Sequence, residues 1–348
     1  MESRKLQKVG YSTLSISIPS NWVKEMNLKR GDTVFLVPEK DGSLKLFPSK
    51  LLKPQEGIEE NICNADLCDD PKMLERIIVG NYILGRDLVS IISAERIRPE
   101  HIEEIRGIMP KLIGLGIIEE TPDRITLQCS VDPRKFHLDM LLRRLSVISL
   151  TIVKEAVQAL LDFDDSLAEV AVKREDEADM MYLLAMRLLF SAQRRREVAK
   201  EIGLDDPLQI LYYGLMLRYL EMIADYAQEI ARRVIELLQK YKDRLPQWVI
   251  ERYSNLNDLA HDLVLKSVDC FFIGDIKIAN SVLEMRTFVE LERDRLMQEL
   301  PEIPHLRLIL WNITRIAYNG ARIALIAINN AVERKTKICT KRWSTSFK

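Results

Sequence analysis

The alternation of apolar and polar residues changes twice along this chain of 348 residues. In the first 50 residues Leu14, Ile16 and Ile18 alternate with serines, which is typical of a half-buried strand. The other elements predicted here are strands at Val34–Val37 and Leu44–Phe47 and a short helix at Asn21–Met26. A unit this small has little core of its own, so we expect a partner chain to complete it.

The next two segments have different textures. Residues 51–71 are acidic and lack periodicity, which indicates a linker. Residues 72–132 alternate between helical and strand periodicity, which predicts a small α+β domain. Its predicted helices are Met73–Leu84 and Pro99–Leu115, and its predicted strands are Leu88–Ser93, Ile117–Glu120 and Arg124–Cys129.

From residue 134 to 334 the periodicity is helical almost throughout. Glycine is rare in this segment, and prolines stand where breaks are needed. Six helices are predicted at about 136–161, 165–200, 206–242, 246–272, 275–299 and 304–334. Helices of this length normally pack lengthwise as antiparallel bundles. A basic tail follows at 335–348.

The six helices resemble two copies of three. Asp164, which we interpret as a helix cap, aligns with Asp275 at a shift of 111 residues. The Glu175-x-Glu177-x-Asp179 run instead aligns with Glu290-x-Glu292-x-Asp294 at a shift of 115 residues. The two registers differ by about one helical turn, so the repeat is suggested while its register stays open.

Charge and composition exclude several classes of protein. The chain has 51 Lys and Arg residues and 52 Asp and Glu residues, which excludes a uniformly basic protein. The first 50 residues nevertheless carry an excess of positive charge, with nine basic and five acidic residues. No apolar run approaches the 20 or so residues of a membrane span. The five cysteines form no C-x-x-C pair and the N-terminus has no secretory signal, so we expect a cytoplasmic protein.

An enzyme is not predicted. The chain has no phosphate-binding G-x-x-x-x-G-K-[ST] loop, no G-x-G-x-x-G, no G-x-S-x-G and no H-E-x-x-H motif. Its four histidines are scattered, without a nearby acid–base constellation.

Two pairs of carboxylates stand at i, i+4 spacing on neighbouring long helices, Glu175 with Asp179 and Glu221 with Asp225. Four such groups could hold a hard or borderline cation, such as iron, manganese, zinc or magnesium. The alternative is a solvated helix face on which nearby arginines pair with the acids. Burial of the carboxylates would favour the metal, because an unpaired buried carboxylate is costly.

Basic and hydroxyl side chains of the first 50 residues could contact nucleic-acid phosphates and base edges. The alternative is an ordinary solvated surface. The candidate DNA-binding residues are Arg4, Lys5, Lys8, Ser12, Thr13, Asn21, Lys24 and Arg30.

The same segment resembles the SpoVT/AbrB family, which includes the MazE-like antitoxins. The residues that carry the resemblance are Lys5-Leu6-Gln7-Lys8-Val9-Gly10, Ser15-Ile16-Ser17-Ile18-Pro19, Trp22-Val23 and Lys29-x-Gly31-Asp32. The resemblance implies a swapped-hairpin β-barrel, a homodimer and DNA binding. Tyr11 stands where the family usually has an arginine.

Residues 134–334 resemble PhoU, a regulator of phosphate uptake built of two three-helix repeats. Leu220–Ala231 carries the Glu-x-x-x-Asp motif, with Met222 in place of the usual arginine. In the second copy Thr314 and Tyr318 replace both acids, so a symmetric pair of metal sites is not implied. The two resemblances together are similar to archaeal phosphate uptake regulators.

Three functional hypotheses follow. The first is a transcription regulator of phosphate uptake, in which a dimeric head binds operator DNA and the bundle senses phosphate status. The second is an adaptor that docks on the ATPase of a phosphate ABC transporter and inhibits uptake, with the head serving only for dimerisation. The third is a metal-storage or metal-dependent bundle. The overall expectation is a mainly α, multidomain fold.

Overall fold

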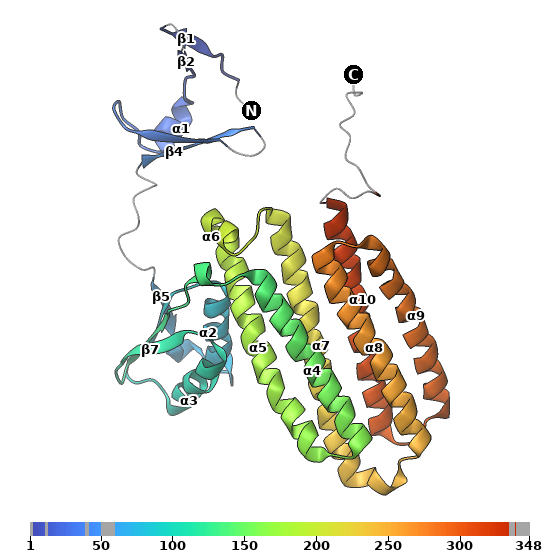
Figure 1. Ribbon diagram of the computed structural model, residues 1–348. Coiled ribbons are helices and arrows are strands. Elements are labelled where there is room, and N and C mark those ends of the chain that lie inside the picture. Colours follow the sequence, from blue (N-terminus) through green and yellow to red (C-terminus); the bar gives the residue numbers. More distant parts are fainter. Residues whose placement is uncertain (1–2, 11–12, 39–41, 50–59, 334–337, 339–348) are drawn as a thin grey trace. The chain divides into compact units, whose positions relative to one another are not determined.

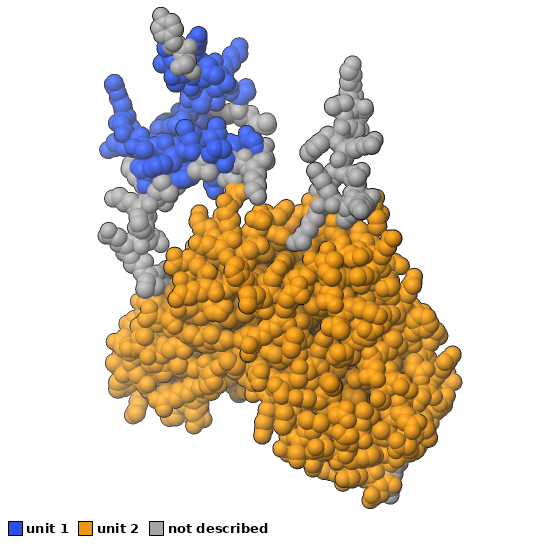
Figure 2. Space-filling view, in the orientation of Figure 1, with its two compact units in different colours: residues 1–58 blue, residues 59–348 orange. Residues whose placement is uncertain are grey.

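A computed structural model describes residues 3–10, 13–38, 42–49, 60–333 and 338. The chain divides into two compact units, residues 1–58 and 59–348, coloured separately in Figure 2. We call the first unit the head. Within the second unit, residues 60–132 form an α+β domain and residues 138–333 form the bundle. The candidate DNA-binding residue Ser12 and the basic tail, apart from Ile338, lie outside the described residues.

The head consists of two antiparallel hairpins and one short helix. Strand β1 (Gln7–Val9) pairs with β2 (Thr13–Ser15), and β3 (Val34–Pro38) pairs with β4 (Leu44–Pro48). Helix α1 (Ser20–Glu25) lies between the hairpins in sequence. Strand β2 ends at Ser15, earlier than the apolar alternation through Ile18 predicts.

The head buries very little of its apolar surface. Pro48 is the only buried residue among those that the structure describes in this unit. The exposed large apolar side chains here are Leu6, Val9, Leu14, Ile16, Phe35, Leu36 and Leu44. The described residues of a single head form two separate two-stranded sheets and no closed barrel. The swapped barrel therefore stays a prediction about a dimer.

The α+β domain is built on a four-stranded sheet in the order β5-β6-β8-β7. Strand β5 (Glu60–Asn64) runs parallel to β6 (Leu88–Ile92), whereas β8 (Arg124–Cys129) is antiparallel to β6 and to β7 (Leu115–Glu120). Helix α2 (Met73–Ile83) connects the parallel pair. The prediction of a linker over 51–71 was therefore wrong from Glu60 onward, because this polar edge strand lacks a clear apolar alternation.

The predicted helix over Pro99–Leu115 was also too long. Helix α3 (Pro99–Ile108) gives way to the short 3-10 helix η3 (Met109–Lys111), and β7 starts at Leu115. Pro110 lacks an N–H and cannot continue an α-helix. Gly114 then turns the chain with φ of 79°, so the segment between α3 and β7 places Lys111 at a tight corner.

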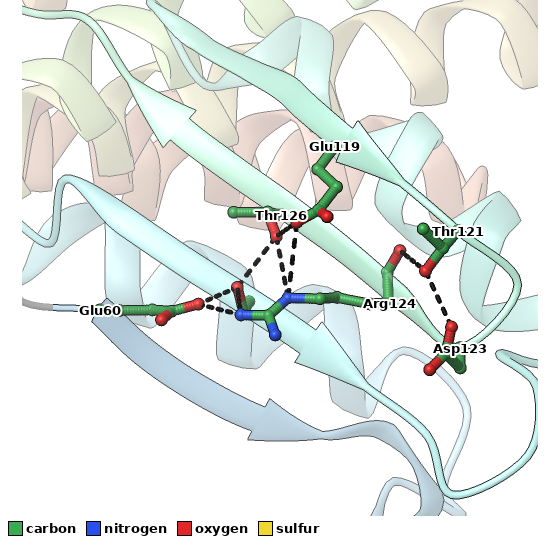
Figure 3. Close-up of polar contacts among 7 residues, drawn as sticks. Glu60, Glu119, Thr121, Asp123, Arg124 and Thr126 are labelled. Carbon is green, nitrogen blue, oxygen red and sulfur yellow. Dashed lines mark hydrogen bonds and ion pairs between the residues drawn. The ribbon is translucent and has the colours of Figure 1, made fainter.

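One face of the sheet is apolar and packs on the helices, through Val89, Ile91, Ile125 and Leu127. The other face carries a network of polar side chains from all four strands (Figure 3). Arg124 donates to Glu60 and to Ser90, and Thr126 donates to Glu119 at 3.1 Å. These cross-strand contacts provide hydrogen-bond partners for the buried hydroxyl groups of Ser90 and Thr126.

The bundle contains the long helices of the chain, together with short α6 (Figure 1). Their bounds are α4 Leu138–Asp162, α5 Asp165–Arg194, α6 Arg196–Glu201, α7 Pro207–Tyr241, α8 Gln247–Ile273, α9 Ile276–Glu299 and α10 Pro304–Glu333. The predicted helix over 165–200 is interrupted at Arg195, which is extended. Helices α4, α5 and α7 pack as one group and α8, α9 and α10 as another, and α7 with α10 and α4 with α8 join the groups.

The ends of the first helix in each group match. Asp164 caps α5 by accepting from the Leu167 N–H, and Asp275 caps α9 by accepting from the Ile278 N–H. The residues before them, Phe163 and Gly274, are both left-handed, with φ of 56° and 76°. Both features favour the 111-residue register, and the interpretation of Asp164 as a cap is confirmed.

The α+β domain packs against the outer side of α5 (Figure 1). Leu183 of α5 belongs to the core of that domain, and the fully buried Arg187 donates to its backbone. No helix in the described part of the chain is both long and apolar enough to cross a membrane.

Candidate functional site

The four carboxylates predicted to act together do converge between α5 and α7. Glu175 and Asp179 lie one turn apart on α5, and each interacts electrostatically with Asp225 of α7. Asp176 joins them, since carboxylate oxygens of Glu175, Asp176 and Asp179 lie within 4.8 Å of one another. We call Glu175, Asp176, Asp179, Glu221 and Asp225 the acidic cluster.

Glu175 is the most deeply buried member of the acidic cluster, with 9% of its surface exposed. Gln228 of α7 donates from Nε2 to Glu175 Oε2 at 2.9 Å. Burial raises the pKa of Glu175 to about 8, and the neighbouring Asp179 carboxylate adds to the effect by its charge and by a hydrogen bond. Folding therefore favours the protonated form of Glu175.

Glu221 and Asp225 contribute from α7. Burial and the Asp225 carboxylate raise the pKa of Glu221 to about 7, although Arg218 opposes this by donating to Glu221 Oε2 at 2.7 Å. Partial burial and the Asp179 charge also raise the pKa of Asp225. Crowded like charges thus raise the pKa values of several members of the cluster.

Lys111 of the α+β domain supplies a positive charge to the acidic cluster, and this pairing was not predicted from the sequence. Its Nζ atom lies 2.7 Å from Asp176 Oδ1 and 3.0 Å from Asp179 Oδ2. Burial would lower the pKa of Lys111, but the hydrogen bonds and charges of these two carboxylates raise it overall. Only the fold shows this pairing, because Lys111 lies 68 residues from Asp179.

The acidic cluster can be tested for its fit to a metal ion. Its oxygen donors are of the kind that bind hard cations. Lys111, however, already bridges Asp176 and Asp179, so its ammonium group occupies the position between these two carboxylates. The residues as arranged do not fit a resident metal ion, and the metal predicted from the sequence would have to displace Lys111.

In the corresponding region of the second helix group, arginines stand beside the acids. At the 111-residue register Arg286 stands where Glu175 is, and Glu290 stands where Asp179 is. Arg286 lies over the ring of Tyr318 at 4.7 Å and donates to Glu290 at 2.9 Å. Arg293 donates to the Tyr318 hydroxyl at 2.8 Å. The acids of this region thus pair with arginines of α9, and among the described residues they form no second carboxylate cluster.

The candidate DNA-binding residues within the described part of the head are all exposed. They are Arg4, Lys5, Lys8, Thr13, Asn21, Lys24 and Arg30. Lys8 lies on β1, Thr13 on β2, and Asn21 and Lys24 on α1. Their role in DNA binding stays a prediction.

An apolar groove of about 380 Å³ was not anticipated from the sequence. It lies between the C-terminal part of α5 and the N-terminal part of α7, where Phe190, Leu211 and Leu215 are exposed. The periodicity placed these residues on helices but could not distinguish an exposed apolar stripe from a buried one.

Comparison with known proteins identifies two segments. Residues 142–234 match the family model for the PhoU domain, and residues 7–53 match the model for "Antidote-toxin recognition MazE, bacterial antitoxin". The PhoU match covers α4, α5 and α7 up to Val234, and so includes the acidic cluster.

Among solved structures, PhoU from Pseudomonas aeruginosa is similar with a TM-score of 0.49 and 21% sequence identity, covering 57% of this chain and 96% of that chain. No curated protein matches this sequence. By the family models, residues 7–53 are thus similar to the MazE antitoxins and residues 142–234 to the PhoU domain.

Proposed function

We propose that the protein is a homodimeric, DNA-binding transcription regulator of phosphate uptake, in which the PhoU-like bundle senses phosphate status. Its PhoU and MazE-like domains support a role in phosphate regulation. DNA binding by the head and sensing by the bundle are the finer parts of the proposal. A metal ion is not required for either.

The observation that carries the proposal is the exposure of the large apolar side chains of the head. Pro48 alone is buried among the described residues there, while seven large apolar side chains are exposed. A unit of about 50 residues with so little core is unstable by itself. A second copy of the head would cover these strands and supply the missing core.

Dimerisation would also place two basic surfaces side by side. The first 50 residues carry nine basic and five acidic residues, and two copies double this excess. A two-fold symmetric pair of heads fits a palindromic DNA site. Lys5 and Lys8 are exposed on this unit and suit contacts with phosphate oxygens.

The test is DNA binding by the full-length protein. We would titrate it against DNA from upstream of its own gene and of phosphate transporter genes, at several salt concentrations. Charge reversal with Lys5→Glu and Lys8→Glu should weaken binding about 100-fold or more and reduce the salt dependence. The matched control is Lys173→Glu with Lys240→Glu, which makes the same charge change on the bundle.

Sequence-selective binding that the head variant loses and the control retains would support the proposal. Binding that is sequence-blind, or equal for both variants, would contradict it. Analytical ultracentrifugation of the wild type at micromolar concentration tests the dimer separately.

The second candidate function is the transporter adaptor. The apolar groove with Phe190, Leu211 and Leu215 favours it, because exposed apolar patches often mark protein interfaces. In this case Leu211→Asp should abolish co-purification with the transporter ATPase, and the Lys5 and Lys8 reversal should have no effect on regulation. The opposite pattern favours the transcription regulator.

A further inference from the structure

We propose that Lys111 replaces a metal ion as the cation of the acidic cluster, so that the α+β domain is held on the bundle by the same carboxylates that would otherwise bind a divalent metal. This inference concerns unit 59–348 alone and does not depend on DNA binding. It follows from the misfit between the carboxylate donors and a resident metal ion.

The geometry places the ammonium group between two carboxylates. Lys111 Nζ lies 2.7 Å from Asp176 Oδ1 and 3.0 Å from Asp179 Oδ2, which are hydrogen-bonding distances for charged partners. Asp179 also interacts electrostatically with Glu175 and Asp225, so the charge of Lys111 acts on the cluster through Asp179 as well as Asp176. A divalent ion that bridged Asp176 and Asp179 would need the same oxygens.

The charges of the region require a cation. The five carboxyl groups of the acidic cluster lie close enough to interact electrostatically. Among the described residues, Lys111 and Arg218 form ion pairs with them. Arg218 pairs with Glu221 at 2.7 Å. Asp176 and Asp179 therefore depend on Lys111, whose removal would leave an excess of negative charge that attracts a metal ion.

The backbone fixes the position of Lys111. It is the last residue of η3, and Pro110 ends the preceding helix at this corner. About eight residues along α5, the buried Arg187 donates to the backbone oxygens of Tyr82 and Arg86 of the same α+β domain, at 2.8 and 3.0 Å. Two cations thus connect the α+β domain to α5: Lys111 belongs to the domain and Arg187 belongs to α5.

The consequence is a competition between domain docking and metal binding. A metal ion can enter only when Lys111 leaves the two carboxylates, and the α+β domain then loses the ion pairs that Lys111 forms with α5. The second helix group is similar in this respect, because its acids Glu290 and Asp294 pair with the chain's own cations, Arg286 and Arg293.

The experiment measures binding of Mn²⁺ to the full-length protein by calorimetry after dialysis against a chelator, together with elemental analysis of the protein as purified. The wild type and Lys111→Arg should carry no stoichiometric metal and bind Mn²⁺ weakly. Lys111→Met should bind one Mn²⁺ at least ten times more tightly than the wild type. Adding Asp179→Asn to Lys111→Met should abolish the gain.

Amide hydrogen exchange gives a readout that does not involve metal. Exchange at residues 109–113 should rise in Lys111→Met and stay at the wild-type level in Lys111→Arg. A wild-type protein that binds Mn²⁺ as tightly as Lys111→Met does would overturn the proposal. So would a Lys111→Met variant that is folded, as judged by circular dichroism, and shows no gain in Mn²⁺ affinity.

Discussion

The guanidinium of Arg187 donates from Nη1 to the backbone oxygen of Tyr82, at 2.8 Å and across 105 residues of sequence. The same group donates to Arg86 O at 3.0 Å and forms an ion pair with Asp87. With 1% of its surface exposed, Arg187 is a buried charge whose partners all belong to the α+β domain. The interface between the α+β domain and the bundle therefore contains a buried charge beside the apolar contact of Leu183.

Arg187→Ala should destabilise unit 59–348 strongly. The change removes two buried hydrogen bonds to backbone oxygens and the ion pair with Asp87, and it opens a cavity. We expect a loss of about 3–5 kcal/mol in the free energy of unfolding. Urea unfolding followed by circular dichroism measures it. Arg174→Ala is a control, because that arginine pairs with Glu155 in a partly exposed position and should cost about 1 kcal/mol or less.

Gly320→Val should destabilise the bundle, because α10 and α8 touch at this residue. A Cβ atom here would lie 2.6 Å from Leu263 Cδ2 and 3.3 Å from the Val264 backbone. Overpacking of this kind costs about 1–3 kcal/mol. In contrast, Gly80→Ala in α2 meets nothing within 4 Å and should stabilise by about 0.5–1 kcal/mol. Thermal unfolding of both variants shows whether the signs differ.

Glu175→Gln should stabilise the protein in a pH-dependent way. The pKa of Glu175 is raised from 4.5 to about 8, so the folded state binds an extra proton between these values. This contribution to stability is fully present below about pH 4.5 and is lost as the pH rises through about 8. Glutamine resembles the protonated form at every pH.

We therefore expect similar melting temperatures for Glu175→Gln and the wild type at pH 5, and a variant that melts roughly 3–6 °C higher at pH 9. Differential scanning calorimetry at both pH values provides the comparison. A difference that does not change with pH would mean that Glu175 is already ionised in the native protein.

Asp164→Ala should destabilise the bundle by about 1 kcal/mol, because Asp164 accepts from the Leu167 N–H at the start of α5. Asp275→Ala should cost a similar amount at the start of α9. Asp165→Ala is the matched control, since Asp165 lies within the first turn and accepts no capping bond that the structure records. Equal melting temperatures for Asp164→Ala and Asp165→Ala would contradict the prediction.

The sequence was sufficient for the helical part of the fold. Long runs of 3.6-residue periodicity, together with Asp164, Pro207 and Pro304 at helix starts, locate α4 to α10 to within a few residues, apart from the break at Arg195. It failed at β5, where exposed and half-buried residues alternate but most of the side chains are polar, so the apolar signal is too weak. It also missed the early end of α3, although Pro110 was visible in the sequence.

The candidate site was predictable only in part. The i, i+4 spacing placed Glu175 with Asp179 and Glu221 with Asp225, and the packing of α5 on α7 brings the two pairs together. Lys111 could not be foreseen, because a pairing across 68 residues depends on how the α+β domain docks. Burial, which decides the protonation of Glu175, likewise belongs to the tertiary structure.

The contribution of Leu183 to the core of the α+β domain has a consequence for biosynthesis. At about 5–20 residues per second, a ribosome needs roughly 3–10 s to proceed from Cys129, the end of the last strand, to Leu183. During this interval the nascent domain exposes the apolar surface that α5 later covers. Translation order therefore makes α5 the element that completes the α+β domain, before the second helix group has been synthesised.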